Sequence, residues 1–576
     1  MIAPPFQDDK SLRAAPANPL PPLWGRMETL WLLVAPLCAL LYTLCLPLAP
    51  NDLWYHVRAG ELIARGAIPT QNLMSSAIAL DAPYYYQSWL AELVLFVTLK
   101  IGGLSGLVLV RSFFVAGAFL AVTAATFRAL LRLPDPPTRL VAARISALGA
   151  ILGLLMASNN LDLRPQVFSL FGFGVWIFAA LEFRAAPPRN RARWGAFLAV
   201  WIWVWANTHG AFIVALLGLF ALALSDRLWR RENFKTSLGV AIAAGAAALL
   251  NPRGAALYGY VAGLSRDEVS QKWVQEWRSP GFDEWHSILF WACAAGIFLA
   301  AIVSRMFLRR QIPQKMKGKA NAKEFLALLL PLALFFSMAA RDQRSIVWFA
   351  LWLVPVLGAL CCGFIRGKPA PVLPVAPVPR AALGINATLL VLLGLSPLAL
   401  FPGFKAGWPW PKEFKQRFAP TPSSFAADPA LLLENTTPVA ATQFLLKNPP
   451  RGKLWTDMVC GSYLTYAGRG EIRPWCDPRI EMFPVEFWED YLKLSGGPRD
   501  AVAQMEARGF SDVLLDRENT PALARRFRES AGWRRVAANG STLLFRRDSR
   551  FRCDSRFRRD SRFRATTKNR AATKND

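Results

Sequence analysis

The sequence predicts an α-helical polytopic membrane protein with about eleven spans, followed by a small α/β domain. Of its 576 residues, 53% are hydrophobic and only 18% are charged, which is not the balance of a soluble domain. Several apolar runs reach the roughly 20 residues that a helix needs to cross the hydrocarbon core of a bilayer. After residue 401 the apolar runs shorten and charged residues return, so we expect the membrane domain to end there.

The predicted spans follow from window hydropathy along the chain. They lie at about 29–48, 104–127, 143–160, 166–183, 194–206, 211–225, 237–250, 287–304, 325–340, 345–365 and 382–401. Arg and Lys cluster in every second loop between these runs, and such loops stay in the cytoplasm. The N-terminus is therefore predicted to be cytoplasmic and the C-terminal domain extracytoplasmic.

Five segments are predicted along the chain. They are a cytoplasmic N-terminal segment (1–26), a multi-span membrane domain (27–401) with an external loop at 50–88, a linker (402–436), an extracytoplasmic α/β domain (437–547) and a basic tail (548–576). The tail repeats units such as RRDSRF with a period of six and has few apolar residues to bury, so we expect disorder. It either binds anionic lipid head groups or is a neutral product of repeat expansion, and its composition favours the second.

The net charge of +28 does not indicate a nucleic-acid-binding protein. The basic residues lie in the short loops between apolar runs and in the tail, and no folded nucleic-acid-binding module is recognisable. Membrane lipids are the expected partners of this charge, and no nucleic acid is expected.

The α/β domain is predicted from alternating helical and strand patterns. Helices are expected in PVAATQFLLKN, VCGSYLTYAG, VEFWEDYLKL, AVAQMEARG and at 522–531, and strands in KLWTDM, IRPWCD, DVLLD and a terminal hairpin. Cys460 and Cys476 fall in this domain, which is predicted to face an oxidising compartment. They are disulfide candidates, with two buried thiols as the alternative.

The external loop begins with NDLWYHVRAGELIARGAIP at Asn51. Residues 52–65 have helical character, and Gly66 with Pro69 forms a stop signal. A second amphipathic piece, QSWLAELVLFVTLKIGG at 87–103, is expected to lie along the membrane surface with Glu92 facing solvent.

Polar residues at the predicted outer ends of spans are the candidate functional residues, because such residues are costly near a bilayer. Asp52 and His56 are four residues apart and so share one helix face, where they suit a metal site or an acid–base pair. The alternative is a helix N-cap at Asp52 beside an interfacial histidine.

Further polar residues are expected to converge on the same outward-facing mouth. Three arginines suit bidentate phosphate binding, and other polar residues would line the cavity; the arginines are Arg164, Arg341 and Arg344, and the others are Asn207, His209, Arg253 and His286. For each arginine taken singly, snorkelling to the interface is the alternative.

The stretch DLWYHVRAGELIARGAIP resembles the first external loop of GT-C fold glycosyltransferases, and most of all that of oligosaccharyltransferase catalytic subunits. Such enzymes use polyprenyl-phosphate-linked sugars. The resemblance implies that Asp52 ligates a divalent cation (Mn²⁺ or Mg²⁺) or acts in catalysis.

Residues 30–547 also resemble a group of bacterial multi-span membrane proteins of this type, which implies the bacterial inner membrane. The shared motifs are RPQ at Arg164–Gln166, W-x-N-x-HG at Trp205–Gly210 and D-x-R at Asp477–Arg479. Those relatives often carry a His-Glu pair where this chain has Gln87-Ser88, and the Trp-Trp-Asp signature for sequon reading is absent from the sequence. Protein N-glycosylation is therefore not expected.

The predicted function is transfer of a sugar from a polyprenyl-phosphate donor to a lipid, glycan or protein acceptor at the outer membrane face. Asp52 would hold the cation or take the proton, His56 would assist, and the arginines would neutralise the departing phosphate. The alternative is a non-catalytic cell-envelope protein that binds lipid-linked glycan, which the missing acid at 87–88 favours.

Overall fold

The chain forms two compact units in a computed structural model that describes residues 22–133, 135–311, 319–365 and 380–548. The helical unit comprises residues up to Leu46, Ser105–Ser265 and Gln271–Trp408. The sheet unit comprises Pro47–Leu104, Arg266–Ser270 and the chain from Pro409 onward. Most of the predicted N-terminal segment and nearly all of the repeat tail lie outside the described residues.

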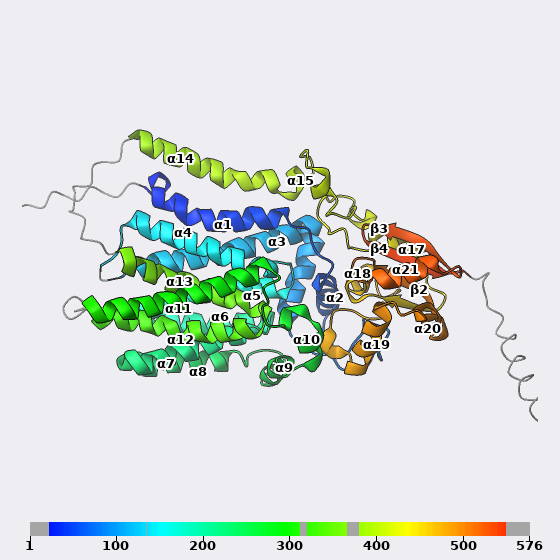
Figure 1. The fold of residues 1–576 in the computed structure, drawn as a ribbon, viewed down its shortest axis with the longest axis horizontal. Coiled ribbons are helices and arrows are strands. Elements are labelled where there is room, and N and C mark those ends of the chain that lie inside the picture. Colours follow the sequence, from blue (N-terminus) through cyan, green and yellow to red (C-terminus); the bar gives the residue numbers. More distant parts are fainter. Residues whose placement is uncertain (1–21, 134, 312–318, 366–379, 549–576) are drawn as a thin grey trace, which may run out of the picture. The chain divides into compact units, whose positions relative to one another are not determined.

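Long apolar helices run side by side in the helical unit (Figure 1). They are α1 (Met27–Cys45), α3 (Trp89–Leu131, which begins in the sheet unit), α4 (Arg139–Met156), α5 (Pro165–Ala185), α6 (Pro188–Thr208), α7 (Phe212–Trp229), α8 (Phe234–Ala247), α11 (Trp285–Gln311), α12 (Lys319–Arg341), α13 (Ile346–Ile365) and α14 (Arg380–Leu395). Each predicted apolar run falls on one of these helices. Within the described ranges, seven helices are long and apolar enough to cross a membrane, so an integral membrane protein is supported and the count of about eleven stays a prediction.

The core of the helical unit is aromatic. The ring of Phe173 on α5 lies 5.2 Å from that of Trp176 and 5.3 Å from that of Phe335 on α12. Trp176 also contacts Trp352 of α13 at 5.4 Å between ring centroids. Offset and edge-to-face contacts of this kind stabilise a core beyond the area they bury, which explains why α5 is the most completely buried of the candidate spans.

Two buried cations close the C-terminal end of α1. Arg111 on α3 donates to the carbonyl oxygens of Thr43 (2.8 Å) and Leu46 (2.6 Å), and Lys405 donates to that of Leu44 (2.9 Å). The last carbonyls of a helix lack partners within it and carry a partial negative charge. These contacts therefore fix the point at which the chain leaves α1 for the loop that begins at Pro47.

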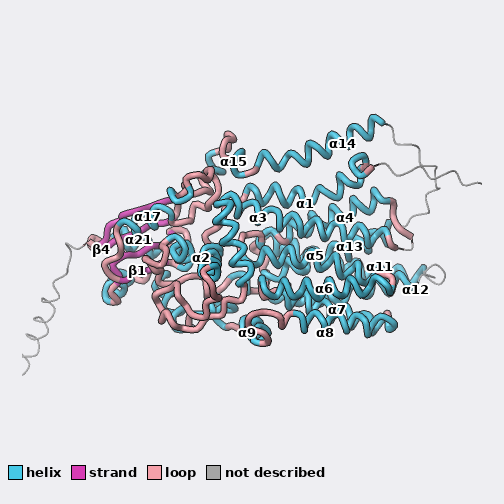
Figure 2. Tube along the Cα trace, turned by 180° about the vertical axis from the view of Figure 1, so that it is seen from behind, coloured by secondary structure: helices cyan, strands magenta, loops and turns pink. Residues whose placement is uncertain are grey.

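The sheet unit is built on a four-stranded sheet in the order β1-β2-β4-β3, drawn in magenta in Figure 2. The strands are β1 (Lys453–Thr456), β2 (Phe510–Asp516), β3 (Trp533–Asn539) and β4 (Thr542–Arg547). β1 pairs parallel with β2, whereas β4 runs antiparallel to both β2 and β3. The small mixed sheet confirms that residues beyond the apolar runs form an α/β structure.

The sheet unit also contains helices. Those of the C-terminal part are α17 (Val439–Lys447), α18 (Met458–Ala467), α19 (Val485–Ser495), α20 (Ala501–Ala507) and α21 (Pro521–Glu529). Other short helices within the described residues are α9 (Ala256–Leu264), α10 (Glu268–Trp273), α15 (Pro402–Lys405) and α16 (Lys412–Lys415). The five helices predicted for the α/β domain and the strands in KLWTDM, DVLLD and the hairpin are confirmed.

The strand predicted for IRPWCD at 472–477 is wrong, because these residues form irregular chain. Pro474 has no N–H to give to a sheet, and the neighbouring backbone groups bind the loop instead. The carbonyl oxygens of Pro474 and Trp475 accept from the N–H groups of Ser76 (2.9 Å) and Ala77 (3.0 Å). The loop and the C-terminal domain thus share one hydrogen-bonded core, as two segments on one side of a membrane can.

The loop itself contains α2 (Leu53–Ala64), which ends where Gly66 adopts a φ of 129°. This confirms the helix and the stop predicted there. The second predicted helix is the first part of α3, and Gly103, with a φ of 61°, interrupts that helix before the apolar part begins. The carboxylate of Asp428 accepts from the N–H of Leu104 at 2.9 Å and so caps the helix that continues from the break.

Candidate functional site

A buried histidine–carboxylate pair joins α2 to α3. His56 Nδ1 lies 2.8 Å from Glu92 Oε1, and the two residues are 9% and 2% exposed. The expectation that Glu92 faces solvent is therefore wrong. It lies one helical turn beyond Ser88, so the chain carries an acid close to the position at which the sequence had indicated a missing one.

Gly60 makes this pairing possible. A Cβ at residue 60 would lie 2.0 Å from the backbone oxygen of Glu92 and 2.9 Å from Cβ of Phe96, so only glycine lets α2 and α3 approach this closely. His56 precedes Gly60 by one helical turn and lies on the same face of α2. The close crossing therefore brings the imidazole within hydrogen-bond distance of the Glu92 carboxylate.

The second oxygen of this carboxylate, Glu92 Oε2, is buried and has no hydrogen-bond partner among the described residues. Leaving a buried polar atom unsatisfied costs about 1–3 kcal/mol, and more for a charged group. A ligand or a catalytic role is one of the explanations for such an atom in a native structure. The pair thus has an acceptor atom available in a site that is otherwise closed to water.

Asp52 occupies the N-cap position of α2, but its side chain makes no capping hydrogen bond. Only its backbone carbonyl takes part, accepting from the N–H of His56 at 3.3 Å. The alternative in which the Asp52 carboxylate serves as a helix cap therefore loses its physical basis. The carboxylate and His56 share one face of α2, as their spacing predicts.

The predicted divalent cation finds a poor donor set here. Within the described parts of the chain, no group of three or more His, Cys, Asp and Glu side chains lies close enough to hold a metal ion. Mg²⁺ and Mn²⁺ favour six oxygen-rich ligands, and His56 Nδ1 already faces Glu92. These residues do not fit a protein-held cation, and we derive no step through one.

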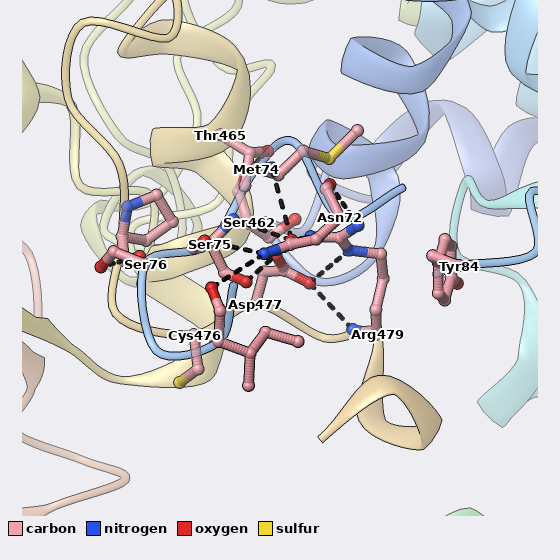
Figure 3. A network of polar contacts seen from close by, with 12 residues as sticks. Asn72, Met74, Ser75, Ser76, Tyr84, Ser462, Thr465, Cys476, Asp477 and Arg479 are labelled. Atoms are coloured by element: carbon pink, nitrogen blue, oxygen red, sulfur yellow. Dashed lines mark hydrogen bonds and ion pairs between the residues drawn. The ribbon is translucent and has the colours of Figure 1, made fainter. Parts of the chain in front are cut away.

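The D-x-R motif forms a buried ion pair in the sheet unit (Figure 3). Arg479 donates to both oxygens of the Asp477 carboxylate, through Nε (2.8 Å) and Nη2 (2.6 Å), and both residues are fully buried. The same guanidinium donates to the backbone oxygen (2.9 Å) and Oδ1 (2.8 Å) of Asn72 and to the hydroxyl of Tyr86 (3.2 Å). The motif is therefore a clamp that holds the loop to the C-terminal domain.

Asn72 connects Arg479 to the rest of the loop through further hydrogen bonds. Its Oδ1 accepts from the N–H (3.2 Å) and Oγ (3.0 Å) of Ser75, and its Nδ2 donates to the carbonyl of Ser75 at 2.9 Å. Tyr86 packs with Tyr55 and Ala59 of α2 in one apolar cluster. Burial raises the pKa of the Tyr86 hydroxyl, so this group is a neutral donor in the network.

Two of the three predicted phosphate-binding arginines act on one carboxylate in the helical unit, that of Glu276, one by direct contact and one through its charge. Arg164, the N-cap residue of α5, donates through Nη2 to Glu276 Oε1 at 2.5 Å. The guanidinium carbon of Arg344 lies 4.5 Å from the ring centroid of Trp277, the residue that follows Glu276. Burial would raise the pKa of the Glu276 carboxyl, but Arg164 and Arg344 outweigh it and hold that pKa below its ordinary value. Arg341 instead donates to the carbonyl of Ser265 at 2.8 Å.

The polar residues predicted to line a cavity bind backbone groups or neighbouring side chains. The amide of Asn207 donates to the carbonyls of Trp203 (2.9 Å) and Leu250 (3.1 Å). His209 Nδ1 lies 2.8 Å from Ser169 Oγ and accepts from the N–H of Ala211. These contacts hold the end of α6.

The two remaining predicted residues lie in or beside the connection between α8 and α11. Arg253 lies in a turn where its backbone N–H donates to Asn251 Oδ1 at 2.8 Å. His286 Nε2 lies 2.8 Å from Glu284 Oε2. The predicted site residues thus fall into two groups, Asp52 and His56 in the sheet unit and the others in the helical unit.

Cys460 and Cys476 are free and fully buried, so the disulfide predicted between them is absent. Cys460 packs in an apolar cluster with Leu445 and Leu464, and Cys476 Sγ lies 3.6 Å from the carbonyl oxygen of Thr456. Burial raises the pKa of both thiols well above the ordinary value. They behave as small apolar core residues, the alternative that the sequence had left open.

No protein-family model matches the chain, and no curated protein matches it. Among solved structures it is similar to ArnT from Cupriavidus metallidurans bound to undecaprenyl phosphate, with 16% identity over 90% of this chain and 98% of that one and a TM-score of 0.45. It is also similar to the oligosaccharyltransferase AglB from Archaeoglobus fulgidus in complex with an inhibitory peptide and a dolichol-phosphate, at 13% identity, 92% and 75% coverage and a TM-score of 0.45.

A third similar structure is the Archaeoglobus fulgidus oligosaccharyltransferase with zinc and sulfate, at 13% identity, 85% and 68% coverage and a TM-score of 0.45. The similar structures thus include the enzyme type to which the loop sequence pointed, the oligosaccharyltransferases. At these identities and TM-scores they say nothing about the substrates or the site residues of this chain, which have to be argued from its own geometry.

Proposed function

We propose that the chain is a GT-C-like membrane glycosyltransferase, which moves a sugar from a polyprenyl-phosphate donor to an acceptor hydroxyl at the outer membrane face. The observation that carries the proposal is the buried His56–Glu92 pair, in which Glu92 Oε2 has no partner among the residues that the structure describes. It lies in the loop whose sequence resembles the catalytic loop of such enzymes. The sugar and the acceptor are left open.

We assign His56 the part of general base, which its contact with Glu92 supports. When Nδ1–H donates to the Glu92 carboxylate, the lone pair of Nε2 is directed away from it and can accept a proton. The carboxylate holds the ring in this tautomer and stabilises the imidazolium that forms, as the acid of a catalytic triad does. A neighbouring carboxylate on the same helix face, Asp52, adds negative potential where positive charge develops on the sugar.

The proposed reaction is a single displacement. The acceptor oxygen attacks the anomeric carbon while its proton passes to His56 Nε2. The bond from that carbon to the phosphate oxygen breaks, and the electron pair leaves with the lipid phosphate. Arg164 and Arg344 are the proposed binding residues for the lipid phosphate, because a guanidinium group can donate to two phosphate oxygens at once.

The alternative, a non-catalytic glycan-binding protein, is favoured by the absence of an acid at 87–88. The buried carboxylate of Glu92, paired with His56, supports the enzyme instead.

The test uses the purified full chain in lipid nanodiscs with a panel of polyprenyl-phosphate-linked hexoses and pentoses. We expect release of the sugar, to water or to an added acceptor, with at least one donor. Asp52→Asn and His56→Ala should each lower the rate about a hundredfold or more, the scale on which a general base acts. Failure of every donor with the wild type, or undiminished rates with both variants, would contradict the proposal.

A further inference from the structure

The connection between α8 and α11 places a carboxylate close to the two arginines proposed to bind the phosphate, in contact with Arg164 and within the electrostatic influence of Arg344. Glu276 belongs to the short 3₁₀ turn Gln275–Trp277, and its Oε1 lies 2.5 Å from Arg164 Nη2. Trp277 supports Arg344 by a cation–π contact at 4.5 Å. A single turn of the chain thus contacts both arginines.

Asn160 shows that the two arginines belong to one site. Its Oδ1 accepts from Arg164 Nη2 at 3.4 Å, and its Nδ2 donates to the carbonyl oxygen of Arg344 at 3.1 Å. Arg164 is the N-cap residue of α5, and Arg344 lies in the turn Gln343–Ser345 that leads into α13. The partial positive charges of two long helix N-termini add to the two guanidinium groups, so the place that Glu276 occupies attracts anions.

We propose that Glu276 is an internal stand-in for the lipid phosphate, and that the donor must displace this carboxylate from Arg164 and Arg344 in order to bind. The proposal rests on the function proposed above and adds a competitor to its phosphate site. A carboxylate and a phosphate both present paired oxygens that fit the guanidinium fork. The ligand class is therefore a polyprenyl phosphate, which is a diester in the sugar donor and a monoester after transfer, and the Glu276 carboxylate fills the site in its absence.

The surroundings allow the side chain to leave while the backbone stays in place. The N–H of Gln343 donates to the carbonyl of Arg278 at 3.0 Å, and Ser279 Oγ donates to that of Arg341 at 3.1 Å, so the chain after Glu276 is tied to the turn before α13. By contrast, the Glu276 side chain is 38% exposed, whereas that of Arg164 is 14% exposed. Rotation of one side chain into solvent is enough to open the site.

An internal competitor lowers the apparent affinity for a ligand by the fraction of time during which it blocks the site. The lowered pKa of Glu276 means that the carboxyl is ionised at neutral pH, so the competitor is always present in its charged form. The consequence for a carrier lipid is weaker retention. After transfer, the return of Glu276 to the arginines would help to release the lipid phosphate.

The experiment measures binding of undecaprenyl phosphate to the full chain in nanodiscs, with inorganic phosphate as a second probe. We expect Glu276→Gln to tighten binding about fivefold or more. Glu268→Gln, which removes an exposed charge from the same connection, should leave the affinity unchanged. Glu276→Asp is the decisive variant, because it keeps the charge but shortens the reach to Arg164.

If contact with the arginines is what matters, Glu276→Asp also tightens binding. If Glu276 acts only through its long-range charge, Glu276→Asp binds like the wild type and the proposal is wrong. Unchanged or weaker binding by Glu276→Gln with an unaltered unfolding midpoint overturns it as well. If neither the wild type nor Glu276→Gln binds undecaprenyl phosphate, the result counts against the proposed function. If Glu276→Gln tightens the binding of inorganic phosphate alone, Glu276 does compete with phosphate, but the ligand is not the lipid.

Discussion

Two buried pairs of polar side chains in the sheet unit differ in how completely their hydrogen bonds are made. In the clamp, Arg479 is surrounded by oxygens of Asp477, Asn72 and Tyr86, and both carboxylate oxygens of Asp477 accept from it. In the pair formed by His56 and Glu92, one carboxylate oxygen is engaged and the other has no partner among the described residues.

The difference in hydrogen bonding indicates which pair stabilises the fold and which is available for chemistry. A buried pair in which every group is satisfied rigidifies the fold, and removing one member leaves an uncompensated charge. A buried pair with an open acceptor adds less to stability, but it offers an atom to a substrate. The clamp therefore organises the loop, and the pair on α2 and α3 is the candidate reactive group.

The largest stability effect is expected at the clamp. Arg479→Ala leaves Asp477 buried without its cation, which costs about 3–5 kcal/mol and should lower the unfolding midpoint by about 10 °C. Arg508→Ala removes an exposed partner of Asp490 and should change it by no more than about 2 °C, because exposed pairs contribute little. Thermal unfolding of the full chain in detergent measures both. Equal shifts would show that the clamp is not what holds the loop.

Asp457, another buried acid of the sheet unit, extends the comparison to the pH dependence of stability. Its carboxyl group accepts hydrogen bonds, but no cationic side chain among the described residues pairs with it. Asp457 accepts from the N–H groups of Cys460 (2.7 Å) and Asp516 (2.6 Å), and burial raises its pKa to about 6. The folded state therefore holds this proton more tightly than the unfolded state does. The resulting stabilisation is complete below about pH 4 and is lost as the pH rises through 6, with a size of about 3 kcal/mol.

Asp457→Asn removes this titration. The unfolding midpoint of the wild type, measured relative to that of Asp457→Asn, should rise as the pH is lowered from 7 to 4. A difference that stays constant over this range would show that Asp457 does not titrate as its burial requires.

Much of the local structure could be predicted from the sequence, because its signals are local. The stop at Gly66 ended α2 as expected, and each apolar run became a helix. The prediction of a strand at 472–477 was wrong because Pro474 interrupts a sequence that otherwise alternates as a strand does.

The candidate site was harder to predict, because its central contact joins residues 36 positions apart in the sequence. An amphipathic helix alone places Glu92 in solvent, and only the close crossing at Gly60 buries it. A glycine in the interior of a predicted helix was the available signal. The disulfide failed for a related reason, since the spacing of Cys460 and Cys476 carries no information on where each thiol packs.

The most direct test of the account is the rate of Glu92→Gln in the donor assay described above, beside Glu61→Gln. Glu61 lies on α2 and pairs with Arg58 and Arg65 near the surface, so its variant controls for charge removal in the same loop. Glutamine at residue 92 preserves size and one acceptor oxygen but not the charge that orients His56 and stabilises its protonated form. We predict that Glu92→Gln lowers kcat about a hundredfold or more, with unchanged donor affinity and unfolding midpoint, while Glu61→Gln keeps the wild-type rate. A folded Glu92→Gln protein with the wild-type kcat would contradict the account.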